Sequence, residues 1–282
     1  MSYKTILVHV DATAPTLERI RIAARISAAQ DAHLSALATT GVAQVLFQSS
    51  ALEFSDPNLN VYFETLRKRA LDALLPFEPL AQNAGVRSFD SALVNDETGG
   101  GFIAHARTSD LIVLGQTDPN APSPTVSRDF PQYVLMNAGH PVLLTPYVGS
   151  FPEFGQRVLV AWDGGVEAAR AVSGALPLLK AAQSVDVILL NAASVFAPQE
   201  PSAPHYGADL LQYLGRHGVH AEISRQRTKT DIGSTLLSLA ADMSSDLIVM
   251  GAYGHSRFRE SLLGGATRTV LEAMTVPVLM AH

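Results

Sequence analysis

The stretch GAYGHSRFRESLLGG, residues 251–265, could bind a phosphate chain, because glycines stand at both ends of a basic loop. Gly251 and Gly254 directly follow the apolar run DLIVM, and Gly264 and Gly265 close the loop nine residues later. Glycine lets the backbone turn tightly and lets a ligand approach with no Cβ in the way. A single Gly-x-x-Gly motif predicts only a turn, so the inference depends on both glycine clusters together.

A helix is expected directly after this loop, at residues 266–275. A helix N-terminus offers unpaired N–H groups and a partial positive charge, both of which favour an anion. Basic side chains surround that position, namely His255, Arg257, Arg259 and Arg268. The loop between a buried strand and a helix start therefore indicates a site for phosphate.

The elements that would position this loop occur twice along the chain. TILVHVD ends at Asp11 and RVLVAWD at Asp163, which are 152 residues apart. SDLIVLG and SDLIVMG end at Gly115 and Gly251, which are 136 residues apart. The first copy therefore carries 16 more residues before its fourth strand, and we place them at 45–60, where the second copy has no counterpart.

Each copy alternates apolar strand patterns with helical patterns. In the second copy the strands are expected at 157–162, 185–190, 219–224, 246–250 and 276–281, and the helices at 166–180, 207–217, 231–244 and 266–275. Continuous apolar strands are typical of parallel sheets covered on both faces. The pattern predicts an α/β fold with two tandem, doubly wound, mainly parallel five-stranded sheets flanked by helices, in domains 1–148 and 156–282.

In such sheets ligands bind beyond the carboxyl ends of the strands, where Asp163 and Gly251 both stand. The first copy keeps Asp11 and Gly115, but its loop reads GQTDPNAPSPTVSRDFP. A carboxylate at Asp118 repels phosphate, and three prolines remove N–H donors. The positions concerned are Asp118, Pro119, Pro122, Pro124, Arg128 and Asp129. We expect no nucleotide in this half.

Composition narrows the class of protein. The 282 residues are 47% hydrophobic and 16% charged, with a net charge of −6, so a globular protein without a nucleic-acid footprint is expected. The absence of cysteine excludes disulfides and thiolate catalysis and fits a reducing compartment. No apolar run is long enough to span a bilayer, and no signal peptide is recognised. We therefore expect a cytoplasmic protein without membrane contact.

The sequence lacks the motifs of metal sites, of nucleophilic catalysis and of other nucleotide-binding folds. The nine histidines show no metal-ligand spacing, and His9, His140 and His282 stand at element ends without an evident role. Nucleophile-elbow, P-loop and dinucleotide fingerprints are absent. Glu260 and His255 are the only titratable groups inside the loop that could act as a general base, and both are expected to face solvent.

The loop resembles the nucleotide signature of the universal stress protein family, Gly-x-x-Gly, nine residues, then Gly followed by Ser or Thr. Gly265 stands where that family has its hydroxyl residue, and Thr267 lies close by. The resemblance implies an adenine-nucleotide alpha hydrolase-like fold and one site in the second half. By resemblance, Asp163 holds the adenine or ribose edge, and the remaining site residues are Ala161, Ala192, Met250, Gly251, Gly254, His255, Gly264, Gly265, Ala266 and Thr267.

The resemblance also implies a function. It predicts a stress-response sensor or regulator that binds ATP, or AMP or ADP, with Mg²⁺ as an accompanying ion. The last strands of the two domains, PVLLT and PVLMA, are expected to pair within one chain, and a homodimer and an unidentified protein partner stay open. Two alternatives remain at this stage: a nucleotide-independent interaction module, and a slow ATP hydrolase.

Overall fold

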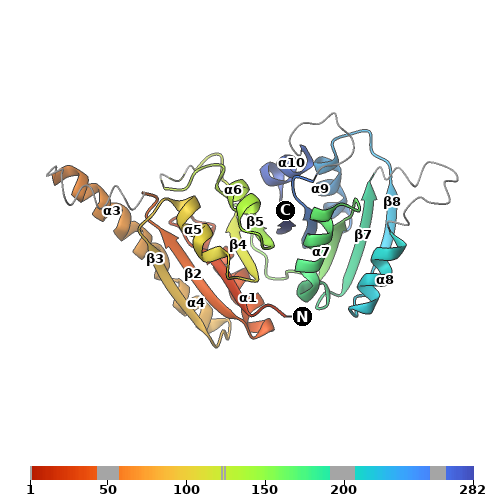
Figure 1. The fold of residues 1–282 in the computed structure, drawn as a ribbon, viewed down its shortest axis with the longest axis horizontal. Coiled ribbons are helices and arrows are strands. Elements are labelled where there is room, and N and C mark those ends of the chain that lie inside the picture. The colour runs from red at the N-terminus through yellow and green to blue at the C-terminus, as the bar shows by residue number, and fades with distance from the viewer. Residues whose placement is uncertain (1, 43–56, 122, 124, 191–206, 255–264) are drawn as a thin grey trace. The chain divides into compact units, whose positions relative to one another are not determined.

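The computed structural model describes residues 2–42, 57–121, 123, 125–190, 207–254 and 265–282. The chain divides into two compact units, Ser2–Val148 and Gly149–His282. Each unit is built from strands that alternate with helices (Figure 1).

Both units share one order of elements. The first contains β1 (Thr5–His9), α1 (Thr16–Gln30), β2 (His33–Thr39), α3 (Pro57–Leu74), α4 (Phe77–Asn83), β3 (Phe89–Val94), α5 (Thr98–Ala106), β4 (Leu111–Gly115), α6 (Phe130–Asn137) and β5 (Val142–Thr145). The second contains β6 (Arg157–Ala161), α7 (Val166–Leu179), β7 (Ser184–Leu190), α8 (Ala208–Arg216), β8 (Glu222–Gln226), α9 (Ile232–Asp242), β9 (Leu247–Gly251), α10 (Gly265–Ala273) and β10 (Val278–Ala281).

The sheets confirm the predicted α/β fold class. In the first unit the strand order is β3-β2-β1-β4-β5, and in the second it is β8-β7-β6-β9-β10. The pairs within each unit are parallel, for example Leu7 opposite Ser35 and Val160 opposite Val249. In each unit the order of strands reverses direction beside the first strand, so β1 lies between β2 and β4, and β6 lies between β7 and β9.

Helices cover both faces of each sheet (Figure 1). In the first unit α1 packs with α4, and α5 packs with α6. In the second unit α7 packs on β9 and β10, while α9 packs with α10. The first four residues of β4 and of β9 are buried, as the apolar runs predict, because helices cover both faces of the sheet, and the final glycine of each strand is half-buried.

Most predicted boundaries in the second unit lie within two residues of those in the structure, and the largest difference is at one strand. The strand expected at 219–224 runs from Glu222 to Gln226 instead. Gly218 adopts a φ of 76°, and the N–H of Val219 donates to the carbonyl of Leu214 at 2.9 Å, so this apolar residue ends the α8 turn. Val219 is therefore part of the C-terminal cap of α8 and not of the following strand.

The extra residues of the first copy lie between β2 and β3. There the first unit has two helices, α3 and α4, where the second describes only α8. Residues 45–56, which are most of the insertion expected at 45–60, lie outside the described residues. Helix α3 follows it directly and packs on β2 and β3, so the longer first copy places an additional helix beside the carboxyl end of β2.

A repeated aspartate fastens the first strand of each sheet to the fourth. Asp110 accepts hydrogen bonds from the N–H groups of Lys4 and Thr5, at 2.6 and 3.0 Å. Asp246, which holds the same place in the second copy, accepts from Gln156 and Arg157 at 3.0 and 3.1 Å. These carboxylates replace backbone partners at the amino edge of the sheet, which explains the repeated Ser-Asp before each buried strand.

Within the described residues, no helix has the length and apolar character that crossing a membrane requires.

Replacing Asp246 by Ala should destabilise the second unit, because two N–H groups at the start of β6 lose their acceptor. We expect the free energy of unfolding to fall by roughly 1–3 kcal/mol. Urea unfolding followed by the fluorescence of the single tryptophan, Trp162, measures this change in the second unit. Asp242→Ala, at an exposed position in α9, is the control and should leave the midpoint unchanged. Equal midpoints for both variants would contradict the proposed fastening.

Candidate functional site

The carboxyl end of β6 forms the centre of the candidate site, because β6 lies between β7 and β9. Asp163 follows this strand and is exposed. Its Oδ1 accepts a hydrogen bond from the N–H of Gly165 at 2.8 Å, across a turn in which Gly164 has a φ of 79°. This turn fixes the carboxylate at the edge of the sheet and starts α7 directly behind it.

Gly251, the last residue of β9, lies against the first turn of α7. A Cβ on Gly251 would lie 2.6 Å from the backbone nitrogen of Ala168 and 2.8 Å from the carbonyl carbon of Glu167. Backbone atoms cannot move aside as a flexible side chain can, so packing within the unit requires glycine here. The sequence-based interpretation assigned this glycine to ligand approach; the structure assigns it to the contact between strand and helix.

Gly254 faces two carboxylates. A Cβ on Gly254 would lie 3.1 Å from Oε2 of Glu167 and 3.9 Å from Oδ2 of Asp163. Sequence analysis did not identify Glu167, although its place four residues after the strand-end Asp163 brings it to the same edge. Two carboxylates beside a loop expected to hold phosphate raise the electrostatic cost of binding a bare anion, and a divalent cation offsets this cost.

Two hydrogen bonds to side chains hold the loop entrance, residues 251–254. Tyr253 adopts a left-handed φ of 54°, and its N–H donates to Oγ1 of Thr267 at 3.0 Å. Nδ1 of His282 donates to the carbonyl of Ala252 at 3.1 Å. Thr267 is 3% exposed, so its hydroxyl holds the loop from inside and does not face solvent as a phosphate ligand would.

The N-terminus of α10 is held by α9. A Cβ on Gly233, in the first turn of α9, would lie 2.8 Å from the carbonyl of Ala266 and 2.7 Å from Cβ of Thr269. Asp231 caps α9 by accepting from the N–H of Ser234 at 2.8 Å, and this hydrogen bond lowers the pKa of Asp231. The close packing of the two helices therefore fixes the place of Gly265.

The structure brings part of the predicted set together. Asp163, Gly254 and the first turn of α7 meet at one edge, and Ala161 ends β6 there, half-buried. Met250 is buried in β9, at 5% exposure. Arg268 lies on the exposed side of α10, where its Nε donates to Glu272 at 2.7 Å. The predicted residues that lie outside the described chain are Ala192, His255, Gly264 and Glu260, together with Arg257 and Arg259.

The equivalent edge of the first unit is filled by its own side chains. Asp11 follows β1 as Asp163 follows β6, but its Oδ1 accepts from Nη2 of Arg19 at 3.0 Å and also from Thr13 and Thr16. Arg19 is 2% exposed, and its Nη1 occupies the place that a Cβ on Gly115 would take. An internal cation thus satisfies the strand-end aspartate.

The charges of this cluster follow from its burial. Burial alone raises the pKa of Asp11, but Arg19, His9 and the threonine hydroxyls outweigh it and hold this pKa below its ordinary value. Burial lowers the pKa of His9 to about 3, against the opposing effect of Asp11. His9 is therefore neutral at pH 7, and its ring lies against Phe102 and Phe130, with centroids 5.4 and 4.7 Å apart.

Metal ligation has no structural support in the part of the chain that is described. No group of three or more His, Asp or Glu side chains there could hold a metal ion.

One family of known proteins matches the second half of the chain. The model of the universal stress protein family matches residues 155–282. This half of the chain is a universal stress protein domain. A comparison with curated proteins gave no match.

Two solved structures extend the likeness in fold to both units. A universal stress protein from Archaeoglobus fulgidus DSM 4304 is 15% identical, with a TM-score of 0.72 over 98% of this chain and 95% of that chain. A functionally unknown protein from Pseudomonas aeruginosa PAO1 is 18% identical, with a TM-score of 0.59 over 98% and 92%. A universal stress protein in complex with cAMP is 18% identical, with a TM-score of 0.37 over 52% and 100%.

His9→Phe should remove part of the acid sensitivity of the protein. The pKa of His9 is about 3 in the folded state and 6.5 ordinarily, so unfolding takes up a proton between these values. Stability from neutral His9 is complete above pH 6.5 and is lost as pH falls towards 3. From pH 6 to 4, the free energy of unfolding should fall by about 1.4 kcal/mol per pH unit more in the wild type than in the variant.

Urea unfolding followed by circular dichroism at several pH values measures both curves. Parallel curves for the wild type and His9→Phe would contradict a buried neutral histidine.

Proposed function

We propose that the second unit binds an adenine nucleotide, namely ATP or a related form such as AMP or ADP, and that the protein acts as a stress-linked regulator. The observation that carries this proposal is the contrast between the two strand-end aspartates. Asp11 is enclosed by donors of its own unit, whereas Asp163 is exposed and its one described hydrogen bond comes from the adjoining turn. An exposed acceptor at a topological switch point suits a ligand.

The start of α10 would receive the phosphates. A Cβ on Gly265 meets no described atom within 4 Å, so there is space before the first turn of this helix. The N–H groups of Gly265 and Ala266 lie in that first turn, and the helix dipole favours an anion. Asp163 would then bind the base or ribose, as the family resemblance implies.

Mg²⁺ would accompany the nucleotide. Glu167 and Asp163 place two carboxylates near Gly254, and Mg²⁺ prefers carboxylate and phosphate oxygens. The ion would reduce the repulsion between these carboxylates and the phosphate chain. Affinity should therefore be lower when Mg²⁺ is removed with a chelator.

A regulatory role agrees better with this geometry than fast catalysis. The hydroxyl of Thr267 holds the loop, and Arg268 is paired with Glu272. Neither side chain is therefore placed to stabilise the charge that develops in phosphoryl transfer. A nucleotide-independent interaction module is the alternative if no nucleotide binds.

Gly265→Ser should increase nucleotide affinity. The substitution restores the hydroxyl residue of the family signature in open space, and a hydrogen bond to a charged phosphate oxygen corresponds to roughly a tenfold gain. Gly265→Ala is the matched control, because it adds the Cβ without the hydroxyl. Equilibrium dialysis with labelled ATP and Mg²⁺ should show one nucleotide per chain and tighter binding to the serine variant only.

Asp163→Ala should weaken the same binding, and it is a better loss variant than a change at Gly251, where a Cβ clashes with α7. Binding that neither Asp163→Ala nor Gly265→Ser changes would contradict the site. The absence of any bound ATP at millimolar concentration would support the interaction module.

A further inference from the structure

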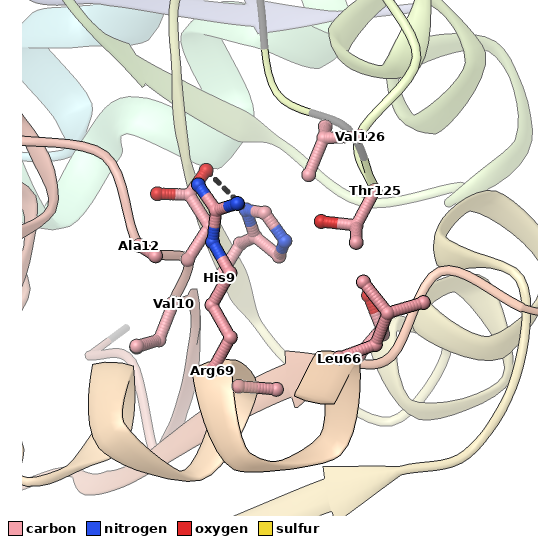
Figure 2. A pocket seen from close by; sticks show the side chains of 10 residues that line it. His9, Val10, Ala12, Leu66, Arg69, Thr125 and Val126 are labelled. Carbon is pink, nitrogen blue, oxygen red and sulfur yellow. Dashed lines mark ion pairs between the residues drawn. The ribbon is translucent and has the colours of Figure 1, made fainter. Parts of the chain in front are cut away.

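A pocket lies in the first unit, and the nucleotide site proposed for the second unit does not explain it. It is lined by His9, Val10, Asp11, Ala12, Thr39, Leu66, Arg69, Ala70, Thr125 and Val126. Figure 2 shows the His9 ring facing the space between Thr125 and Leu66, with Arg69 rising from α3 beside it. Helix α3 thus forms one wall of this pocket.

His9 carries an unused acceptor in this pocket. The residue is 1% exposed, and its Nε2 has no hydrogen-bond partner among the described residues. Its Nδ1 lies 3.9 Å from Oδ2 of Asp11, so the nearby carboxylate favours a proton on Nδ1 of the neutral ring. Nε2 then carries a lone pair. A buried polar atom without a partner is costly, and it indicates a group that is supplied from outside.

The threonines add a second acceptor. Thr98 donates its hydroxyl hydrogen to the carbonyl of Thr125 at 2.7 Å, so in the 2.8 Å contact between Thr39 and Thr98 the donor is Thr39. Oγ1 of Thr39, a residue of the pocket lining, therefore keeps only lone pairs for a further partner. The inner wall, formed by His9 and Thr39, accepts hydrogen bonds, and the group that fits it is a donor.

The outer wall carries positive charge. Arg69 is exposed and has no hydrogen-bond or ion-pair partner among the residues that the structure describes. A groove that shares Ala12 and Arg69 with the pocket continues along α3, past Thr65, Lys68, Asp72 and Ala73. The guanidinium of Arg69 can hold a carboxylate or a phosphate through two N–H groups, and Lys68 adds charge beside it, next to Asp72.

We propose that this pocket binds a small hydroxylated anion. The hydroxyl donates to Nε2 of His9, and the carboxylate or phosphate of the same molecule lies on Arg69. A neutral hydroxyl suits the inner wall better than an ammonium group, because burying a charge there costs more. The Arg19 guanidinium offsets the negative charge of Asp11, and Oδ1 of Asp11 already accepts from Arg19, Thr13 and Thr16. This inference is independent of nucleotide binding in the second unit.

The test uses the full chain with 15N-labelled histidine and four probes. The hydroxylated probes are 3-hydroxybutyrate and glycerol 3-phosphate, which separate a carboxylate from a phosphate source. Butyrate and propyl phosphate are their matched controls without the hydroxyl. The Nε2 resonance of His9, assigned by its absence in His9→Phe, should shift with at least one hydroxylated probe at millimolar concentration and with neither control.

Two helix variants test the anion contact. Arg69→Gln should weaken binding of the active probe by about tenfold, the loss of one charge-assisted contact. Arg67→Gln, which removes the same charge from an exposed position of α3 that lines neither pocket nor groove, should leave affinity unchanged. A His9 resonance that no probe shifts would overturn the proposal and show that water fills the pocket. Equal affinity in the wild type and Arg69→Gln, or an equal response to the controls, would also overturn it.

Discussion

The buried ion pair between Arg19 and Asp11 distinguishes the first half of this protein from the second. In both sheets an aspartate follows the first strand at the switch point, and the fourth strand ends in a glycine. In the first unit the guanidinium of Arg19 takes the space over Gly115 and bonds to the aspartate at 3.0 Å. A buried charge needs such a partner. The fold is therefore duplicated, whereas the chemistry at the carboxyl edge is not.

The glycines that end the two fourth strands differ in what a Cβ at each position would meet. At Gly251 a Cβ would meet the backbone of α7, so glycine is required there even without any ligand. At Gly115 a Cβ would meet only the end of the Arg19 side chain, which would have to move from its place beside Asp11. The open positions of the second unit are Asp163, Gly254 and Gly265, and the functional interpretation depends on them.

The sequence predicted the fold well, because its signals are local and repeated. Apolar runs of strand length, helical patterns between them and the two Asp and Gly offsets identified both sheets. The predicted start of β8 was wrong, because Val219 ends a helix turn, and apolar character alone does not distinguish a helix cap from a strand. The family resemblance on Gly251, Gly254 and Gly264 agrees with the match at residues 155–282.

The site could be predicted only in part. Glu167 and the clash over Gly251 depend on how closely α7 approaches β9, which no spacing rule contains. Nothing in the sequence pattern distinguishes His9 from His140, although the structure buries His9 between Phe102 and Phe130 with a free Nε2. The position of Arg19 was not predictable either, because its two neighbours, Asp11 after β1 and Gly115 at the end of β4, are far apart in the sequence.

The central claim is that one half of the chain keeps an open nucleotide edge and the other half has closed it. Photoaffinity labelling with 8-azido-ATP, followed by mass spectrometry of the labelled peptides, tests this claim most directly. We predict saturable labelling that excess ATP prevents, with every labelled peptide within residues 156–282. Labelled peptides from residues 2–148, or labelling that ATP does not prevent, would contradict the account.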